Sequence, residues 1–132
     1  MTPIVLVVEE QPALRRSYER FLRAEGYRVL VAPPTEEALR LVREQPPDLI
    51  VIDPTAGAGL GRWIADEALR IDPTVRLIFN TCDPMDLELD FSSWMADAFT
   101  RRSPRLEEMG EAVHALLDRA LRVKRSPGHA RA

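Results

Sequence analysis

The sequence has very few residues of two kinds, cysteine and lysine. Cys82 is its only cysteine, and Lys124 is the only lysine among 18 basic residues. A single cysteine excludes a disulfide within the chain and cannot build a zinc site made of cysteines. Because Lys124 lies near the C-terminal end, any role that requires a lysine inside the folded domain is left unfilled.

Long apolar runs and a basic surface stripe are also missing. No run approaches the roughly 20 residues that a membrane-spanning helix needs. The opening MTPIVLVVEE lacks the basic region and the cleavage site of a signal peptide. We therefore expect a cytoplasmic protein with no membrane partner. The net charge is −3, and basic residues concentrate only in the last twelve positions, so we expect no direct contact with nucleic acid.

The 132 residues, 45% of them hydrophobic and 30% charged, are typical of one globular domain. Short apolar strands alternate along the chain with amphipathic helical stretches. The expected strands cover 4–8, 27–32, 48–53, 74–81 and 97–100. The expected helices cover about 12–25 and 36–45, a stretch carrying Leu60, Ile64, Ala68 and Ile71, an irregular stretch within 82–95, and about 104–122.

Five strands alternating with five helices predict an α/β doubly wound domain, with a parallel sheet covered by helices on both faces. We assign residues 1–125 to this domain and 126–132 to a flexible basic tail. In the expected fourth helix, acidic and serine residues interrupt the apolar face, so 83–95 should be the least regular part of the domain. Ligands of such folds bind at the carboxyl ends of the strands.

The third expected strand, DLIVID, ends on a carboxylate, Asp53, and is followed by a glycine-rich loop. Glu9 and Glu10 follow the first strand, Thr81 ends the fourth, and Arg102 lies just past the fifth. Acidic oxygens that converge from separate strands repel one another unless a cation neutralises them, and hard oxygens suit Mg²⁺. Carboxylates, a divalent ion, a hydroxyl and a cation together suit phosphoryl transfer.

Four segments at matching intervals carry a family resemblance: VLVVEEQPALRR, PPDLIVID, LIFNT and ADAFTRR. Together they make the chain resemble the receiver domain of two-component response regulators over about residues 3–122. The resemblance implies a flavodoxin-like fold with the strand order 2-1-3-4-5. It also implies a signalling domain rather than an enzyme.

The resemblance implies a role for each matching residue. Asp53 matches the aspartate that accepts a phosphoryl group from a histidine kinase or phosphotransfer protein. Glu9, Glu10, Asp53 and the main-chain carbonyl of Thr55 match the ligands of Mg²⁺.

Three more positions match the phosphoryl-contacting and switch residues of the family. Thr81 matches the hydroxyl residue that moves toward the phosphoryl group, and Phe99 matches the aromatic residue whose rotation reports that movement. Arg102 stands where the family has a lysine. A downstream protein would bind the face made by helix 4, strand 5 and helix 5, and a homodimer is compatible with the pattern.

Three positions depart from the family pattern. Glu10 stands where aspartate is usual, and its extra methylene displaces a ligand of a small, strictly octahedral ion. Arg102 keeps the charge of the lysine but not its compact ammonium. Gly57 replaces the proline usual four residues after the phosphoacceptor.

These departures leave three hypotheses. The first is a phosphorylated receiver whose state is read by a separate protein, unless this chain is a fragment of a longer product. The second is a pseudo-receiver, which keeps the fold as a constitutive interaction module without the phosphorylation. The third is an unrelated flavodoxin-like enzyme or nucleotide binder, but GAGLG follows the third strand without the Lys-Ser/Thr of a phosphate-binding loop.

Overall fold

The computed structural model describes every residue except 1, 83–94, 104 and 126–132. Its centre is a five-stranded sheet in the order β2-β1-β3-β4-β5, with every neighbouring pair parallel. The strands are β1 (Ile4–Val8), β2 (Arg28–Ala32), β3 (Leu49–Ile52), β4 (Arg76–Thr81) and β5 (Ala98–Arg101). The helices are α1 (Pro12–Ala24), α2 (Glu36–Glu44), α3 (Ala56–Ile71) and α5 (Glu107–Arg125). The expected α/β doubly wound fold and its strand order are confirmed.

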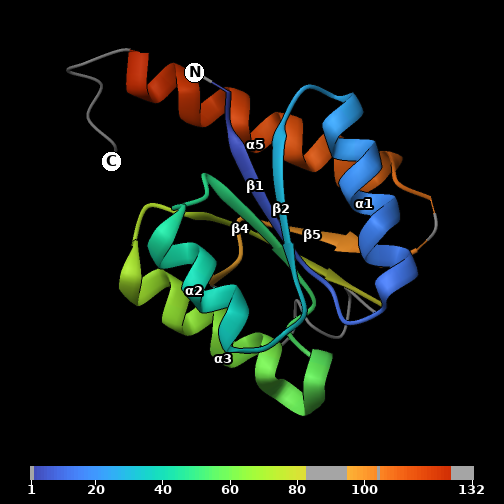
Figure 1. Cartoon of the computed structure of the whole chain (residues 1–132). Coiled ribbons are helices and arrows are strands. Elements are labelled where there is room, and N and C mark those ends of the chain that lie inside the picture. The colour runs from blue at the N-terminus through green and yellow to red at the C-terminus, as the bar shows by residue number, and fades with distance from the viewer. Residues whose placement is uncertain (1, 83–94, 104, 126–132) are drawn as a thin grey trace.

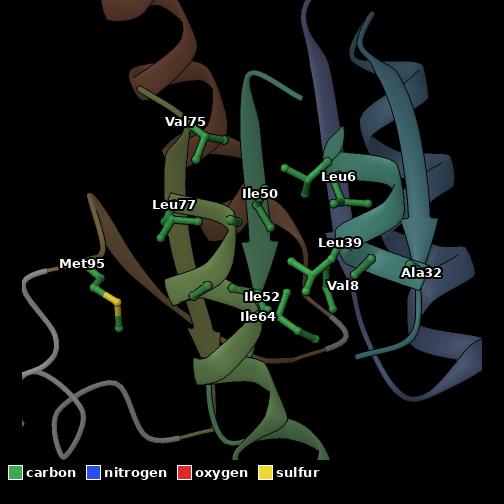
Figure 2. Packing of buried hydrophobic residues seen from close by; sticks show 14 of the residues in the cluster. Leu6, Val8, Ala32, Leu39, Ile50, Ile52, Ile64, Val75, Leu77 and Met95 are labelled. Atoms are coloured by element: carbon green, nitrogen blue, oxygen red, sulfur yellow. The ribbon is translucent and has the colours of Figure 1, made fainter. Parts of the chain in front are cut away.

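Helices cover both faces of the sheet, with α2 and α3 on one side and α1 and α5 on the other (Figure 1). Each layer encloses its own apolar core. The core under α2 and α3 contains Leu6, Ile50, Ile52, Leu77 and Phe79, and Figure 2 shows Leu39 of α2 and Ile64 of α3 reaching toward this side of the sheet. The core under α1 and α5 is built from Val5, Val7, Val51, Ile78 and Met109 with their neighbours. All four residues of β3 are buried, as an apolar run covered on both faces requires.

Local signals in the sequence place several element ends. The Thr35 hydroxyl accepts a hydrogen bond from the Glu37 main-chain N–H and caps α2, as expected. Pro12 begins α1. Gly26 follows the end of α1 with φ 97°, a left-handed conformation in which glycine is unstrained. Within the described residues, no helix is both long and apolar enough to cross a membrane.

The last helix begins three residues later than expected, at Glu107 rather than near residue 104. Ser103 explains part of the delay, because its hydroxyl accepts a hydrogen bond from Arg105 N–H and donates one to the Arg105 carbonyl. This local turn competes with helix formation. The described residues hold four helices, and the fourth of the five expected ones falls on 83–94, outside the described residues. The predicted irregularity of 83–95 and the predicted flexible tail are likewise outside them, apart from buried Met95.

The glycine-rich segment after β3 makes a left-handed turn within α3. Gly57, Ala58 and Gly59 have φ values of 60°, 56° and 99°. A proline, whose ring holds φ near −65°, cannot adopt the Gly57 conformation. The glycine that departs from the family pattern is therefore matched to this turn.

Candidate functional site

Asp53 lies directly after β3 at the carboxyl edge of the sheet and is 7% exposed. One of its carboxylate oxygens, Oδ1, accepts two hydrogen bonds from Thr55, from the main-chain N–H at 2.9 Å and from the hydroxyl at 2.7 Å. A buried carboxylate needs such donors to offset the loss of hydration. The Thr55 bonds also fix the orientation of the side chain, so that Oδ2 faces the Arg102 guanidinium.

Arg102 forms a two-pronged ion pair with Glu9. Its Nε donates to Glu9 Oε1 at 3.0 Å, and its Nη2 donates to Oε2 at 2.7 Å. Glu9 is 2% exposed, and the Arg102 side chain is 14% exposed. These parallel bonds are the strongest arrangement that an arginine makes with a carboxylate.

The same guanidinium lies beside Asp53, with Arg102 Nε 3.9 Å from Asp53 Oδ2. Two buried carboxylates from β1 and β3 thus face one cation from the end of β5. The hydrogen bonds to Glu9 raise the pKa of the Arg102 guanidinium, which stays charged at any physiological pH. The two carboxylates carry two negative charges against the single charge of the guanidinium, so Arg102 compensates the negative charge at Asp53 only in part.

Main-chain contacts hold Arg102 in this position. Its N–H donates to the Thr81 carbonyl at 2.8 Å at the end of β4. The backbone of the next residue, Ser103, acts to lower the pKa of the Tyr18 hydroxyl, against the larger effect of burial. The bond to Thr81 fixes the main chain of Arg102 at the end of β5, from which its side chain reaches Glu9.

The Tyr18 hydroxyl belongs to a buried polar chain that the sequence analysis missed. It accepts from Asn80 Nδ2 at 2.9 Å, and Asn80 Oδ1 accepts from the Thr100 hydroxyl at 2.7 Å. Burial is the main cause that raises the pKa of Tyr18. The sequence gives a weak signal for this polar chain. Asn80 and Thr100 are polar residues inside apolar strands, and buried polar groups need hydrogen-bond partners.

The predicted Mg²⁺ ligands do not come together as a metal site. Both Glu9 oxygens face Arg102, and Oε2 also accepts the Gln11 N–H at 2.9 Å. Glu10 is exposed, and within the described part of the chain no group of three or more acidic, histidine or cysteine side chains could hold a metal ion. As arranged, the donor set suits a guanidinium and does not fit Mg²⁺, which demands near-octahedral oxygen ligands.

Two further predicted residues lie on the strands that end at this edge. Thr81 is buried at the end of β4 and binds Arg102 through its carbonyl. Phe99 is paired in register with Phe79, two residues before Thr81, and their rings meet edge to face with centroids 6.0 Å apart. Phe99 therefore packs against the α2 and α3 core.

Comparisons with known proteins identify the family of the chain. Residues 5–87 match the family model described as the response regulator receiver domain. The chain is 31% identical over 130 residues to the probable transcriptional regulator ycf27 of Pyropia yezoensis, and 31% identical over 117 residues to the DNA-binding response regulator MtrA of Mycolicibacterium smegmatis. These matches cover 94% and 87% of this chain but only 51% and 50% of those proteins, so the chain spans about half of their length.

Solved structures show the same architecture. The response regulator TrrA of Thermotoga maritima, in complex with Mg²⁺ and BeF, matches with a TM-score of 0.78 and 29% identity over 88% of this chain and 99% of that one. TrrA in complex with the histidine kinase ThkA matches with a TM-score of 0.76 and 29% identity, over 89% of this chain and 99% of that chain. A signal receiver domain from Vibrio parahaemolyticus, 22% identical over 98% of this chain and all of that one, shares the fold with a TM-score of 0.84.

Proposed function

Because this chain belongs to the response regulator receiver domain family, we propose that it is a two-component signalling receiver whose phosphoacceptor is Asp53. The donor is a histidine kinase or a phosphotransfer protein, the kind of partner with which the related TrrA is seen. Residues 1–125 form the receiver-like domain in this proposal.

The observation that carries the proposal is the contact between Arg102 and Asp53. Asp53 is buried at the carboxyl edge of the sheet, and a permanent cation lies 3.9 Å from its Oδ2. Phosphoryl transfer depends chiefly on positioning and on neutralising the charge of the transferred group. In this site both requirements are addressed by side chains whose positions are fixed by further hydrogen bonds.

The reaction itself is a displacement at phosphorus. An Asp53 carboxylate oxygen forms the new O–P bond while the P–N bond of the donor phosphohistidine breaks, and the imidazole nitrogen keeps the electron pair. Arg102 neutralises part of the phosphoryl charge, and the Thr81 hydroxyl lies at the end of the neighbouring strand as a further donor. The related TrrA is seen in complex with Mg²⁺ and BeF, but our proposal assigns no step to Mg²⁺ in this chain, because Arg102 already binds Glu9.

The output is a protein contact. A phosphoryl group on Asp53 would draw Arg102 away from Glu9, and the main-chain bond of Arg102 would pass that shift to Thr81. Arg102 directly follows β5, which is the last strand of the sheet, and α5 begins at Glu107. We propose that a downstream protein reads the face of β5 and α5, or that a second copy of the chain binds there.

Phosphorylation of purified protein by a ³²P-labelled small-molecule donor tests the acceptor. Wild type should take up label that base and hydroxylamine both release, as they do from an acyl phosphate, and Asp53→Asn should take up none. The matched control is Asp72→Asn, since Asp72 lies on the far edge of the sheet after α3 and caps a turn through Thr74. Equal labelling of wild type and Asp53→Asn would reject Asp53 as the acceptor.

A second candidate function is the pseudo-receiver. The Glu9–Arg102 pair favours it, because a cation of the chain itself already binds Glu9 and lies beside Asp53. In that case wild type stays unlabelled and Asp53→Asn binds the partner protein as well as wild type does. The labelling experiment and a partner-binding measurement on Asp53→Asn together separate the two functions.

A further inference from the structure

The cation at the acidic edge of the sheet comes from the chain itself. We propose that the Arg102 guanidinium takes the place of a divalent metal ion at Glu9 and Asp53, so that this edge neither requires nor binds Mg²⁺. The inference rests on the proposed function only in sharing Asp53, and it concerns what neutralises the site rather than whether phosphate arrives.

The lone pairs that a metal would use at Glu9 are already engaged. Oε1 accepts from Arg102 Nε, and Oε2 accepts from both Arg102 Nη2 and the Gln11 N–H. Arg15 Nη1 also binds the Glu9 carbonyl at 2.9 Å. Both carboxylate oxygens and the carbonyl of Glu9 therefore already accept hydrogen bonds, and a metal ion bound by both carboxylate oxygens would have to displace the Arg102 guanidinium.

The main chain of Arg102 is also held in place. Its N–H is bound to the Thr81 carbonyl at the end of β4. The planar fork matches a carboxylate in a way that the ammonium of a lysine does not. The arginine that departs from the family pattern thus fits its Glu9 partner closely.

Competition between the guanidinium and a metal gives the proposal a measurable consequence. Mg²⁺ can bind in wild type only if the buried Glu9–Arg102 pair breaks first. Removing the guanidinium leaves two buried carboxylates, Glu9 and Asp53, and one or two carboxylates are the usual protein contribution to a Mg²⁺ site. Loss of Arg102 should therefore create a divalent-cation site that wild type lacks.

The test is an NMR and calorimetric titration of MgCl₂ into wild type and Arg102→Met, with NaCl at equal ionic strength as the reference. We expect no Mg²⁺-dependent shifts at the Glu9 and Asp53 amides of wild type. Arg102→Met should bind Mg²⁺ at least about tenfold more tightly, equivalent to about 1.4 kcal/mol. Its melting temperature should rise with MgCl₂ by mass action.

Two further variants keep the experiment decisive. Glu9→Gln combined with Arg102→Met should lose the gained site, because one of its two carboxylates is gone. Arg102→Gln, which can still donate to Glu9, takes the place of Arg102→Met if that variant does not fold. Mg²⁺ binding by wild type as tight as by Arg102→Met overturns the proposal, and so does the absence of any gain in both Arg102 variants.

Phosphorylation in the presence of EDTA separates this inference from the proposed function. Label on Asp53 without Mg²⁺ supports both. Label that appears only with Mg²⁺ overturns the proposal that Arg102 replaces the metal ion, but it leaves Asp53 as the acceptor. If no label appears under either condition, the phosphoacceptor proposal fails, while the Mg²⁺ titration still decides whether Arg102 replaces the metal.

Discussion

Glu9, at the end of β1, and Arg102, just past β5, are 93 residues apart in the chain and are joined by two parallel hydrogen bonds of 3.0 and 2.7 Å. They link the first and last strands of the fold across the edge where Asp53 lies. Because the pair is buried, its energetics differ from those of the exposed ion pairs on the helices. Arg23–Glu19 and Arg70–Asp66, for example, lie at the surface of their helices, where such pairs contribute little.

The first prediction concerns the stability that this pair provides. Arg102→Met should lower the free energy of unfolding by about 3 kcal/mol, because it leaves a buried carboxylate without its charge partner. Glu9→Leu combined with Arg102→Met should recover most of that loss, since an apolar pair needs no charge compensation. Urea denaturation measures both. Arg105→Met, which removes an exposed arginine nearby, should change stability by less than about 0.5 kcal/mol.

A double variant no more stable than Arg102→Met would contradict this account. It would mean that the loss comes from misplaced packing at the end of β5 rather than from the unpaired charge on Glu9.

The second prediction concerns the buried polar chain that joins Tyr18, Asn80 and Thr100. Asn80→Leu should lower the free energy of unfolding by about 2 to 3 kcal/mol, because it leaves two buried hydroxyls without the amide that they bind. Thr100→Val should cost about 1 to 2 kcal/mol for the orphaned amide oxygen. The double variant should cost clearly less than the sum, because it removes both ends of one bond together.

Thermal or urea unfolding of the four proteins gives the coupling energy. Additivity within about 0.5 kcal/mol, the range for independent sites, would show that Asn80 and Thr100 do not act as a pair.

The sequence predicted the fold more completely than the site. The fold was predicted from local signals, which do not depend on the rest of the chain. The apolar run of β3 indicates a buried strand, Thr35 marks the start of α2, and Gly26 marks the end of α1. The late start of α5 was missed because the Ser103 turn forms through hydrogen bonds that the apolar pattern does not record. Residues 83–94, where a fourth helix was expected, lie outside the described residues.

The arrangement of the site depended on contacts that the sequence does not encode locally. Glu9 and Glu10 are adjacent, and β1 is apolar on both faces, so side-chain alternation could not tell which acid points inward. The structure buries Glu9 and exposes Glu10. The sequence led us to expect a Glu10 side chain that fits a metal site poorly. In the structure Glu10 is exposed, and it is Glu9 that lies inside and pairs with Arg102.

The third prediction concerns the close approach of α3 to Asp53. A Cβ at Gly61 would lie 2.1 Å from the Asp53 carbonyl oxygen and 3.0 Å from Pro54 Cα, so Gly61→Ala forces backbone to move. We expect it to lower the free energy of unfolding by about 3 kcal/mol. Gly59→Ala is the matched control, because its Cβ meets open space and only the φ of 99° is strained, at a cost of about 1 to 2 kcal/mol.

Chemical denaturation of the two variants gives the comparison. If Gly61→Ala destabilises the protein no more than Gly59→Ala does, the backbone around Asp53 gives way easily, and the close approach does not account for the glycine at position 61.

The last prediction concerns Tyr27, whose hydroxyl shares a hydrogen bond with Nδ1 of His114 on α5. Burial, followed by the negative charges of Asp118 and Glu25, raises the pKa of Tyr27 to about 12. The folded state therefore favours the neutral phenol. This contribution to stability is fully present below pH 10, the value for an unfolded tyrosine, and is lost as the pH rises toward about 12.

Tyrosinate absorbance measures this directly, because the chain has only two tyrosines. Tyr18→Phe leaves Tyr27 as the sole tyrosine, and its titration midpoint should lie clearly above 10 while the protein remains folded. His114→Ala in that background removes the hydrogen-bond partner and opens the phenol to water, so the midpoint should move down toward 10. In parallel, Tyr27→Phe should show a shallower loss of stability between pH 10 and 12 than wild type. A midpoint near 10 in folded Tyr18→Phe would mean that solvent reaches the Tyr27 hydroxyl, and that the contact among β2, α1 and α5 around His114 is looser than the structure has it.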